Sequence, residues 1–371
     1  MKIMVLSSYA PTLVFFREDM MNSMINNGHE VIVAAPEEEK EWVHKFRECK
    51  IKYVSIKGVD RTGTNPIKDI KGFFSILSAI IKEKPDKVFA YQAKTIIYGC
   101  IAAKLSGIKE IYALMGGLGS IFRTKDRNSV VGDILKIEYK VAFYCCNKIF
   151  SQNKDDCREL INTGLIKENK IVMINGSGVN LEKFSEKPFS HNQIFLFVGR
   201  ILKDKGIIEY IEAAKKVKQR YPESRIQIVG YFDTNPTAIT KEEINKYVDE
   251  GIIEYLGATD DVRPFLEKCS VFVLPSYHEG TPKSVLEAMA TGRPIITTDV
   301  PGCRETVIDG INGFLVPARN IDELARIMIW MIEHREETKK MGQESLKICK
   351  EKFDVNKVNE VILKTMGLYH S

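Results

Sequence analysis

Two glutamates that lie eight residues apart, Glu279 and Glu287, are the first candidates for chemistry in this sequence. Both belong to the segment SYHEGTPKSVLEAMATGRPIITT at residues 276–298. The apolar run SVFVLPS predicts a buried strand and PKSVLEAMATG predicts a helix, so Glu279 falls on a loop and Glu287 inside the helix. Carboxylates accept hydrogen bonds from sugar hydroxyls, and we expect a reacting sugar near Glu279 and a ribose near Glu287. The alternative interpretation is a solvated loop glutamate and a glutamate on a helix face.

The start of that helix is the second candidate. Pro282 suits the first helical position, with Thr281 before it as the N-cap, and Gly280 lets the backbone approach a ligand closely. The amino end of a helix carries unpaired N–H groups and a partial positive charge, which favour a phosphate. Gly280, Thr281 and Pro282 are therefore predicted to bind the phosphate-containing ligand.

Two cations follow another predicted strand, in FLFVGRILKDKG at residues 195–206. Arg200 offers a bidentate fork and Lys205 a point charge, and together they suit a diphosphate. The sequence has no D-x-D pair of the kind that holds a metal–diphosphate, so we expect these cations to act without a metal ion. The catalytic candidates are Glu279, Arg200 and Lys205. A solvated turn is the alternative interpretation of KDK.

Two more strand ends in the second half of the chain, QIVGYFD and YLGATDDV, supply Gly230, Tyr231 and Gly257. Such edges commonly hold a nucleobase through backbone contacts and a ribose through side chains. These three residues are predicted to bind the same ligand as Arg200 and Lys205. Ordinary loops are an equally weighted alternative.

Residues 1–185 carry 28 Lys and Arg against 21 Asp and Glu, a net charge of +7, whereas the remainder carries 26 against 28. The basic half suits a diphosphate or an acidic membrane surface, although a solubilising surface is an equal alternative. Its candidates for binding a second, acidic substrate stand at predicted strand ends and a helix start: Arg17, Gln92, Lys94, Gly117 and Arg123. The segment GGLG lacks the G-x-G-x-x-G order, so a dinucleotide site is not supported.

The elements that position these residues alternate between apolar β-branched runs and helical patterns along the whole chain. This pattern predicts an α/β protein of two Rossmann-like, doubly wound parallel-sheet domains that face an interdomain cleft. A polar break at 181–193, LEKFSEKPFSHNQ, separates them. We predict an acceptor-binding domain at 1–185, a ligand-binding domain at 186–351, and a terminal helix at 352–371 that packs back on the first domain.

Composition excludes several function classes. No run approaches the ~20 apolar residues of a membrane span, and Met1-Lys2 leads directly into IMVLSS, too short for a secretory segment, so we expect a cytoplasmic protein. The eight cysteines form no C-x-x-C pair and the six histidines show no zinc spacing, so we expect neither metal nor cofactor. Dense Lys/Arg clusters interleaved with aromatics are missing, which disfavours nucleic acid.

One predicted helix, IKDIKGFFSILSAIIKEK at 67–84, is unusually apolar and has lysines at both ends. It could lie on a membrane surface with its lysines among the headgroups. A helix that packs on the core of the sheet is the preferred interpretation.

The segments GRILKDKG, EGTPKSVLEAMATGRPIITT and PGCRETVIDGINGFLV resemble the retaining, nucleotide-sugar glycosyltransferases of family four, which have the GT-B fold. The spacing of Glu279 and Glu287 matches the E-x7-E motif of that family. In the first half, YQAKTIIYG, GGLGSIF, SQNKDD and GSGVN resemble a bacterial branch that builds capsule, O-antigen and glycoprotein glycans on polyprenyl diphosphate.

The resemblance implies transfer of a hexose or N-acetylhexosamine from a UDP-sugar, with retention, to a polyprenyl-diphosphate-linked saccharide at the inner face of the cytoplasmic membrane. Arg200 and Lys205 would bind the donor diphosphate, Glu287 its ribose, and Glu279 the transferred sugar. The family's frequent first-domain histidine is missing; the position reads YQAK, which makes Gln92 and Lys94 its candidate replacements.

Two other functions remain open at this point: a nucleotide-sugar epimerase of the same fold, and a non-catalytic nucleotide-sugar-binding subunit. The presence of both glutamates and both cations argues against the second. The sequence leaves open which sugar is transferred, the acceptor and its linkage position, and the oligomeric state.

Overall fold

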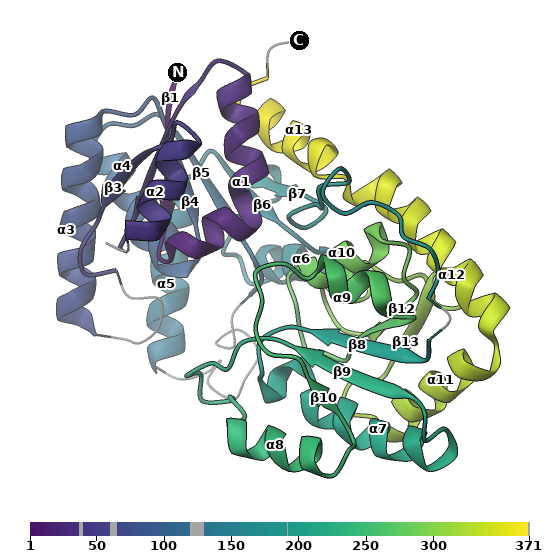
Figure 1. Cartoon of the computed structure of the whole chain (residues 1–371). Coiled ribbons are helices and arrows are strands. Elements are labelled where there is room, and N and C mark those ends of the chain that lie inside the picture. The colour runs from purple at the N-terminus through teal and green to yellow at the C-terminus, as the bar shows by residue number, and fades with distance from the viewer. Residues whose placement is uncertain (37–39, 60–64, 119–129, 191, 370–371) are drawn as a thin grey trace. The chain divides into compact units, whose positions relative to one another are not determined.

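The computed structural model describes residues 1–36, 40–59, 65–118, 130–190 and 192–369. The chain divides into two compact units, which are described separately (Figure 1). Unit 1 comprises Met1–Ser177 together with Val355–Ser371, and unit 2 comprises Gly178–Asp354.

Unit 1 is built on a parallel sheet that, in the described part of the chain, has seven strands in the order β3-β2-β1-β4-β5-β6-β7. Strands β1, β2, β4 and β5 are short, mainly apolar and buried runs, as expected for a sheet covered on both faces, whereas β3 is more polar and partly exposed. The strands are β1 (Lys2–Ser7), β2 (Glu30–Ala35), β3 (Lys52–Ser55), β4 (Lys87–Tyr91), β5 (Glu110–Met115), β6 (Lys148–Ser151) and β7 (Ile171–Met173).

Successive side chains of these strands point to opposite faces and form two separate cores. Met4 and Leu6 of β1 face the helices α3, α4 and α5, whereas Ile3 and Val5 face α1, α2 and the terminal helix α13. The helices are α1 (Ala10–Asn26), α2 (Lys40–Glu48), α3 (Pro66–Glu83), α4 (Cys100–Leu105), α5 (Val130–Cys145), α6 (Lys154–Asn162) and α13 (Val355–Thr365). A π-helical turn, η1 (Thr95–Gly99), joins β4 to α4.

Unit 2 repeats this construction around one continuous core. Its described parallel strands number six, in the order β10-β9-β8-β11-β12-β13. They are β8 (Ile194–Val198), β9 (Arg225–Val229), β10 (Glu254–Tyr255), β11 (Val271–Leu274), β12 (Ile295–Thr298) and β13 (Gly313–Val316).

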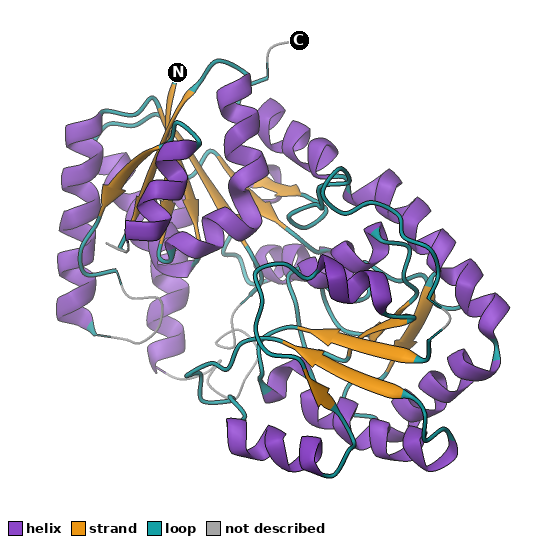
Figure 2. Cartoon of the chain, viewed as in Figure 1, coloured by secondary structure: helices purple, strands orange, loops and turns teal. Residues whose placement is uncertain are grey.

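The helices of unit 2 cover both faces of its sheet, and Figure 2 shows the alternation of helices and strands. Helices α7 and α8 lie on one side and α9 and α10 on the other (Figure 1). The helices are α7 (Ile207–Arg220), α8 (Lys241–Asp249), α9 (Arg263–Lys268), α10 (Lys283–Ala290), α11 (Ile321–Glu333) and α12 (Arg335–Ile348).

The predicted architecture of two doubly wound parallel sheets is confirmed. Three elements were not predicted: α2, α6 and β7. Helix α6 is capped by Asn153, whose side chain accepts a hydrogen bond from the backbone N–H of Asp156 at 2.7 Å. Asn is among the strongest capping residues, so Asn153 was the local signal that could have identified α6.

Candidate functional site

The site in unit 2 lies where the strand order reverses. Strands β8 and β11 are neighbours, and the chain leaves them in opposite directions across the sheet. Ligands of open α/β sheets bind at the carboxyl ends of the strands at such a switch point. Arg200 and Lys205 follow β8, and Glu279 follows β11, so the fold brings together residues that the sequence separates widely.

Lys205 and Glu279 form an ion pair between these two loops. Their side chains are 19% and 13% exposed, so the pair is largely withdrawn from water. Gly206 makes this possible, because its φ is +72° and a Cβ there would lie 2.0 Å from the carbonyl oxygen of Pro275. The backbone N–H of Tyr277 also donates to the carbonyl oxygen of Asp204 at 2.9 Å. The two loops are therefore held as one rigid support.

The segment Pro301–Cys303 supports Glu279 from the other side. The backbone N–H of Glu279 donates to the carbonyl oxygen of Pro301 at 3.2 Å. Gly302 has a φ of +83°, and a Cβ there would lie 2.1 Å from the carbonyl oxygen of Glu279, so glycine is required. Burial, and then the charge of Glu279, raise the pKa of the Cys303 thiol to about 12, which keeps this cysteine neutral beside the ion pair.

Arg200 pairs with Asp233, a residue that the sequence interpretation missed as a contributor to the site. The distance from Arg200 Nη1 to Asp233 Oδ2 is 2.8 Å, and the arginine side chain remains 41% exposed. Asp233 follows β9, so its position after a strand end in QIVGYFD was the signal that could have identified it. The carboxylate orients the guanidinium fork while leaving part of it accessible.

Glu287 lies inside α10 with its side chain 13% exposed. Burial raises its pKa to about 7, while the nearby cations Lys283, with Nζ 3.8 Å away, and Lys183 oppose the shift. Without a ligand, this carboxyl is about half ionised at neutral pH. Two hydroxyl donors would favour the ionised form, because a carboxylate accepts hydrogen bonds from both.

The start of α10 differs from the prediction. The helix begins at Lys283, and Pro282 occupies the N-cap position with an extended ψ of 113°. Thr281 is not the N-cap, and its hydroxyl donates to the carbonyl oxygen of Gly280 at 3.0 Å. The N-cap residue makes no side-chain hydrogen bond to the backbone N–H groups at the start of α10, which the structure describes in full. Proline at the N-cap fixes the approach of the chain, but its side chain has no oxygen that could accept a hydrogen bond from the first N–H groups of the helix.

The ends of β8, β9 and β10 are tied together by glycines. A Cβ at Gly230 would lie 1.7 Å from the carbonyl oxygen of Gly199, so no other residue fits. The N–H of Gly230 donates to the carbonyl oxygen of Gly257 at 2.9 Å. Tyr231, 47% exposed, donates from its hydroxyl to Asp260 at 2.5 Å. These three predicted residues therefore form one continuous shelf beside Arg200.

Unit 1 has its own switch point, between β1 and β4. Gln92, directly after β4, has a φ of +79°, which is unusual for a residue with a side chain. Its Oε1 accepts from the hydroxyls of Ser7 at 2.8 Å and Ser8 at 2.9 Å, and its Nε2 donates to the Thr12 hydroxyl at 3.1 Å. The strained backbone is therefore held by a network of neutral groups.

Arg17 of α1 is 1% exposed, with its guanidinium 4.8 Å from the centre of the Tyr91 ring. Burial lowers its pKa. Within the described part of the chain, its Nε and Nη2 have no hydrogen-bond partner. Buried N–H groups without acceptors are costly and require an explanation, and an acidic ligand is one.

The remaining candidate residues of unit 1 are Lys94, Gly117 and Arg123. Lys94 pairs with Asp69 of α3 at 2.6 Å, and both side chains are less than a fifth exposed. Gly117 has a φ of +136°, a conformation that favours glycine. Arg123 lies outside the described residues.

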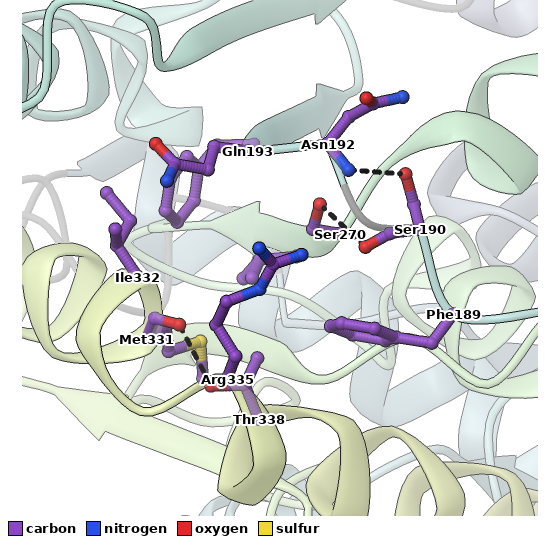
Figure 3. A pocket seen from close by; sticks show the side chains of 11 residues that line it. Phe189, Ser190, Asn192, Gln193, Ser270, Met331, Ile332, Arg335 and Thr338 are labelled. Atoms are coloured by element: carbon purple, nitrogen blue, oxygen red, sulfur yellow. Dashed lines mark hydrogen bonds between the residues drawn. The ribbon is translucent and has the colours of Figure 1, made fainter.

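A small pocket in unit 2 lies at the opposite edge of the sheet, before the first residues of β8 and β11 (Figure 3). Gln193, Ser270 and Arg335 are among its lining residues. Its volume of about 20 Å³ has room for about one water molecule, so a sugar would not fit there.

Comparison with known proteins agrees with this arrangement. Residues 179–347 match the family model for glycosyl transferases group 1, and residues 2–153 match the model for glycosyl transferase 4-like proteins. The chain is 30% identical over 348 residues to the N,N'-diacetylbacillosaminyl-diphospho-undecaprenol alpha-1,3-N-acetylgalactosaminyltransferase of Campylobacter jejuni, covering 90% of each chain. It is 30% identical over 281 residues to the UDP-Gal:alpha-D-GlcNAc-diphosphoundecaprenol alpha-1,3-galactosyltransferase of Escherichia coli, covering 71% of this chain and 70% of that protein.

A solved structure shares the whole fold. The crystal structure of Anabaena HepE in complex with UDP and glucose superimposes with a TM-score of 0.80, at 16% identity and 100% coverage of both chains.

Proposed function

This chain belongs to the GT-B glycosyltransferases of family four, and from that premise we propose that it transfers a hexose or N-acetylhexosamine from a UDP-sugar to a polyprenyl-diphosphate-linked saccharide. The proposal draws on the relatives from Campylobacter jejuni and Escherichia coli, whose names specify undecaprenol-linked acceptors. Capsule, O-antigen or glycoprotein-glycan synthesis at the inner face of the cytoplasmic membrane is the setting that such acceptors imply.

The observation that carries the proposal is that two ion pairs, Lys205 with Glu279 and Arg200 with Asp233, lie in loops that follow strands at the switch point of unit 2. As UDP leaves, negative charge grows on its diphosphate. Cations that are already fixed in position stabilise this charge without reorganisation in the transition state. Two such cations supply the role that a divalent metal has elsewhere, and we propose a metal-independent reaction.

Glu279 is proposed to act electrostatically. Oxocarbenium character develops on the sugar as the leaving group departs, and a nearby carboxylate offsets that positive charge. Its ion pair with Lys205 lowers its reactivity as a nucleophile. We therefore propose attack by the acceptor hydroxyl on the face that UDP leaves, with the departing phosphate accepting the hydroxyl proton, so that the configuration is retained.

Two further donor contacts are proposed in unit 2. Glu287 would accept hydrogen bonds from the ribose hydroxyls, which favours its ionised form. The shelf of Gly230, Tyr231 and Gly257 would hold the base and ribose beside Arg200.

The acceptor is proposed to bind at the switch point of unit 1. Arg17 offers its N–H groups to the acceptor diphosphate, and Gln92 stands where the family frequently has a histidine. Lys94 shares its charge with Asp69, so we assign it a smaller part than Arg17. Gly117 and Arg123 remain predictions.

The test is a transfer assay with a panel of UDP-sugars and a short-chain polyprenyl-diphosphate saccharide, followed by NMR of the anomeric centre in the product. An α-linked product formed in the presence of a chelator supports the proposal. Conversion of the UDP-sugar to an epimer without any acceptor would instead identify an epimerase.

A further inference from the structure

Half of the large apolar side chains that are exposed in the described residues gather on one face of unit 1. They number nine of eighteen. They come from α3, from the end of α4 and from α5: Ile67, Ile70, Phe74, Ile81, Leu105, Ile134, Ile137, Val141 and Tyr144. A concentration of this kind on a water-exposed surface marks an interaction site.

Helix α3 is apolar on both its inner and its outer side. Ile76, Ala79 and Ile80 are buried against the sheet, which is the core packing that the sequence interpretation preferred. The outer stripe follows the same helical period, with Ile67 69% and Phe74 60% exposed. Packing on the sheet explains why the inner stripe is apolar. It does not explain why the outer stripe, which faces water, is apolar too.

Helix α5 repeats this pattern independently. Its outer residues Ile134, Ile137, Val141 and Tyr144 are spaced by three, four and three positions and are 46–82% exposed. Tyr139, Ala142 and Phe143 on its inner side belong to the same core as the inner side of α3. Helix α4 contacts both α3 and α5, and the inner sides of all three helices belong to one core, so the three helices form one layer on one face of the sheet. Figure 1 shows the placement of these helices, and the outer stripes lie on their sides away from that core.

The charges around these stripes are predominantly positive. Five lysines of the three helices are exposed: Lys68, Lys71, Lys82, Lys104 and Lys140. The exposed acid that the structure describes on the same helices is Asp133, which pairs with Lys136 at 3.0 Å. Asp69 and Glu83 point inward to Lys94 and Lys52.

We propose that this α3–α5 face docks on an anionic lipid bilayer, with the apolar stripes in the interfacial region and the lysines among the headgroups. The inference rests on the proposed function, because a polyprenyl-linked acceptor would be held in a membrane. No described helix is both long and apolar enough to span a bilayer. A second copy of the same face is a poorer occupant, since a symmetric pairing would bring lysines against lysines.

The first experiment measures binding of the full chain to phosphatidylcholine vesicles with and without phosphatidylglycerol. Wild type is expected to bind the anionic vesicles, and Phe74→Glu with Ile137→Glu is expected to weaken binding at least about tenfold. Circular dichroism melting checks that this double variant is folded. Ile308→Glu in unit 2 is the matched control, since Ile308 is 56% exposed but lies outside the face, and it should bind like wild type.

A second variant separates the charges from the apolar stripes. Lys71→Gln, Lys82→Gln and Lys140→Gln together are expected to reduce binding to anionic vesicles and flatten its dependence on salt. Unchanged vesicle binding in both multiple variants would overturn the docking proposal. So would light scattering that shows a wild-type dimer which the double glutamate variant dissociates.

Failure of the proposed function is recognised separately. The double glutamate variant should transfer sugar to a water-soluble, short-chain acceptor at the wild-type rate and lose transfer to an acceptor embedded in vesicles. Equal loss with both acceptors would contradict docking as the role of this face. Wild type that binds vesicles but transfers sugar to neither acceptor would refute the proposed function and leave the docking surface supported.

Discussion

The two sheets reverse their strand order at equivalent places, yet the side chains found there differ in kind. At the β8/β11 switch point of unit 2, the cations Arg200 and Lys205 are each paired with a carboxylate. At the β1/β4 switch point of unit 1, Gln92 is held by neutral hydroxyls, and the buried Arg17 has N–H groups without acceptors in the described part of the chain. The fold provides one switch point in each unit, and the loops of each unit determine which side chains stand there.

This difference has consequences for stability as well as for function. A buried cation with a carboxylate partner is compensated before any ligand arrives. An unsatisfied buried guanidinium destabilises the folded chain, and its compensation must come from a ligand. Loss of a cation should therefore have opposite effects on stability at the two switch points, and the substitutions below test this contrast.

The largest effect is expected from Lys205→Ala and Arg200→Ala in unit 2. Each removes a fixed cation from the proposed diphosphate site, which should cost about 3 kcal/mol in the transition state, or roughly a hundredfold in turnover. Lys205→Ala also leaves Glu279 partly buried without its cation, so its Tm should fall.

Lys203→Ala is the matched control for these substitutions. Lys203 lies in the same 3-10 turn as Lys205, but its side chain is exposed. It should retain wild-type kinetics and stability. If Arg200→Ala and Lys205→Ala were both about as active as wild type, the assignment of the diphosphate site would be rejected.

The next largest effect is expected at Glu287, where stability and donor binding should depend on pH in opposite ways. Burial raises the pKa of Glu287 from 4.5 to about 7, so folding disfavours its ionised form. The folded protein therefore loses stability as the pH rises from about 4.5 through about 7, up to ~3 kcal/mol at pH 8. Glu287→Gln should raise the Tm at pH 8 and leave it nearly unchanged at pH 4.

Although Glu287→Gln should stabilise the folded protein at pH 8, it should weaken binding of the UDP-sugar. The proposed contact with two ribose hydroxyls requires ionised Glu287, so the wild-type KM for the UDP-sugar should rise as the pH falls below about 7. Glu287→Gln should have a high KM that no longer varies over this range. Glu242→Gln, at an exposed acid of α8, is the control, and a Glu287→Gln variant with wild-type KM would exclude the ribose contact.

A smaller effect, with the opposite sign to that of Lys205→Ala, is expected from Arg17→Met in unit 1. Methionine fills the space without buried N–H groups, so the free energy of unfolding should increase by about 1–3 kcal/mol. The KM for the lipid-linked acceptor should rise while that for the UDP-sugar stays the same. A fall in stability would show that Tyr91 compensates Arg17 sufficiently in the free protein.

The sequence was sufficient for the sheets and for several site residues because their signals are local. Apolar runs such as IFLFV predict buried strands, and Arg200 and Glu279 stand directly after them. The ion pair of Lys205 and Glu279 joins residues 74 positions apart, so only the arrangement of strands reveals it. Thr281 was wrongly predicted as a cap: Pro282 occupies the N-cap of α10, and the Thr281 hydroxyl donates to the carbonyl oxygen of Gly280. The positive φ of Gln92 and the π-helical turn after it have no local sequence signal either.

The smallest effect is expected from a pair of substitutions at Gln92, which test the neutral network of unit 1. Gln92→Ala and Gln92→Gly both remove the acceptor of Ser7 and Ser8, and both should reduce transfer to the lipid-linked acceptor by roughly tenfold. They differ in the backbone, because alanine must adopt the φ of +79° at a cost of about 1 kcal/mol and glycine adopts it freely. Gln92→Gly should therefore unfold at a higher denaturant concentration than Gln92→Ala, although the two transfer sugar equally. If alanine were the more stable replacement, the hydroxyl network would not be holding a strained backbone, and unit 1 would differ from unit 2 only in the pairing of its charges.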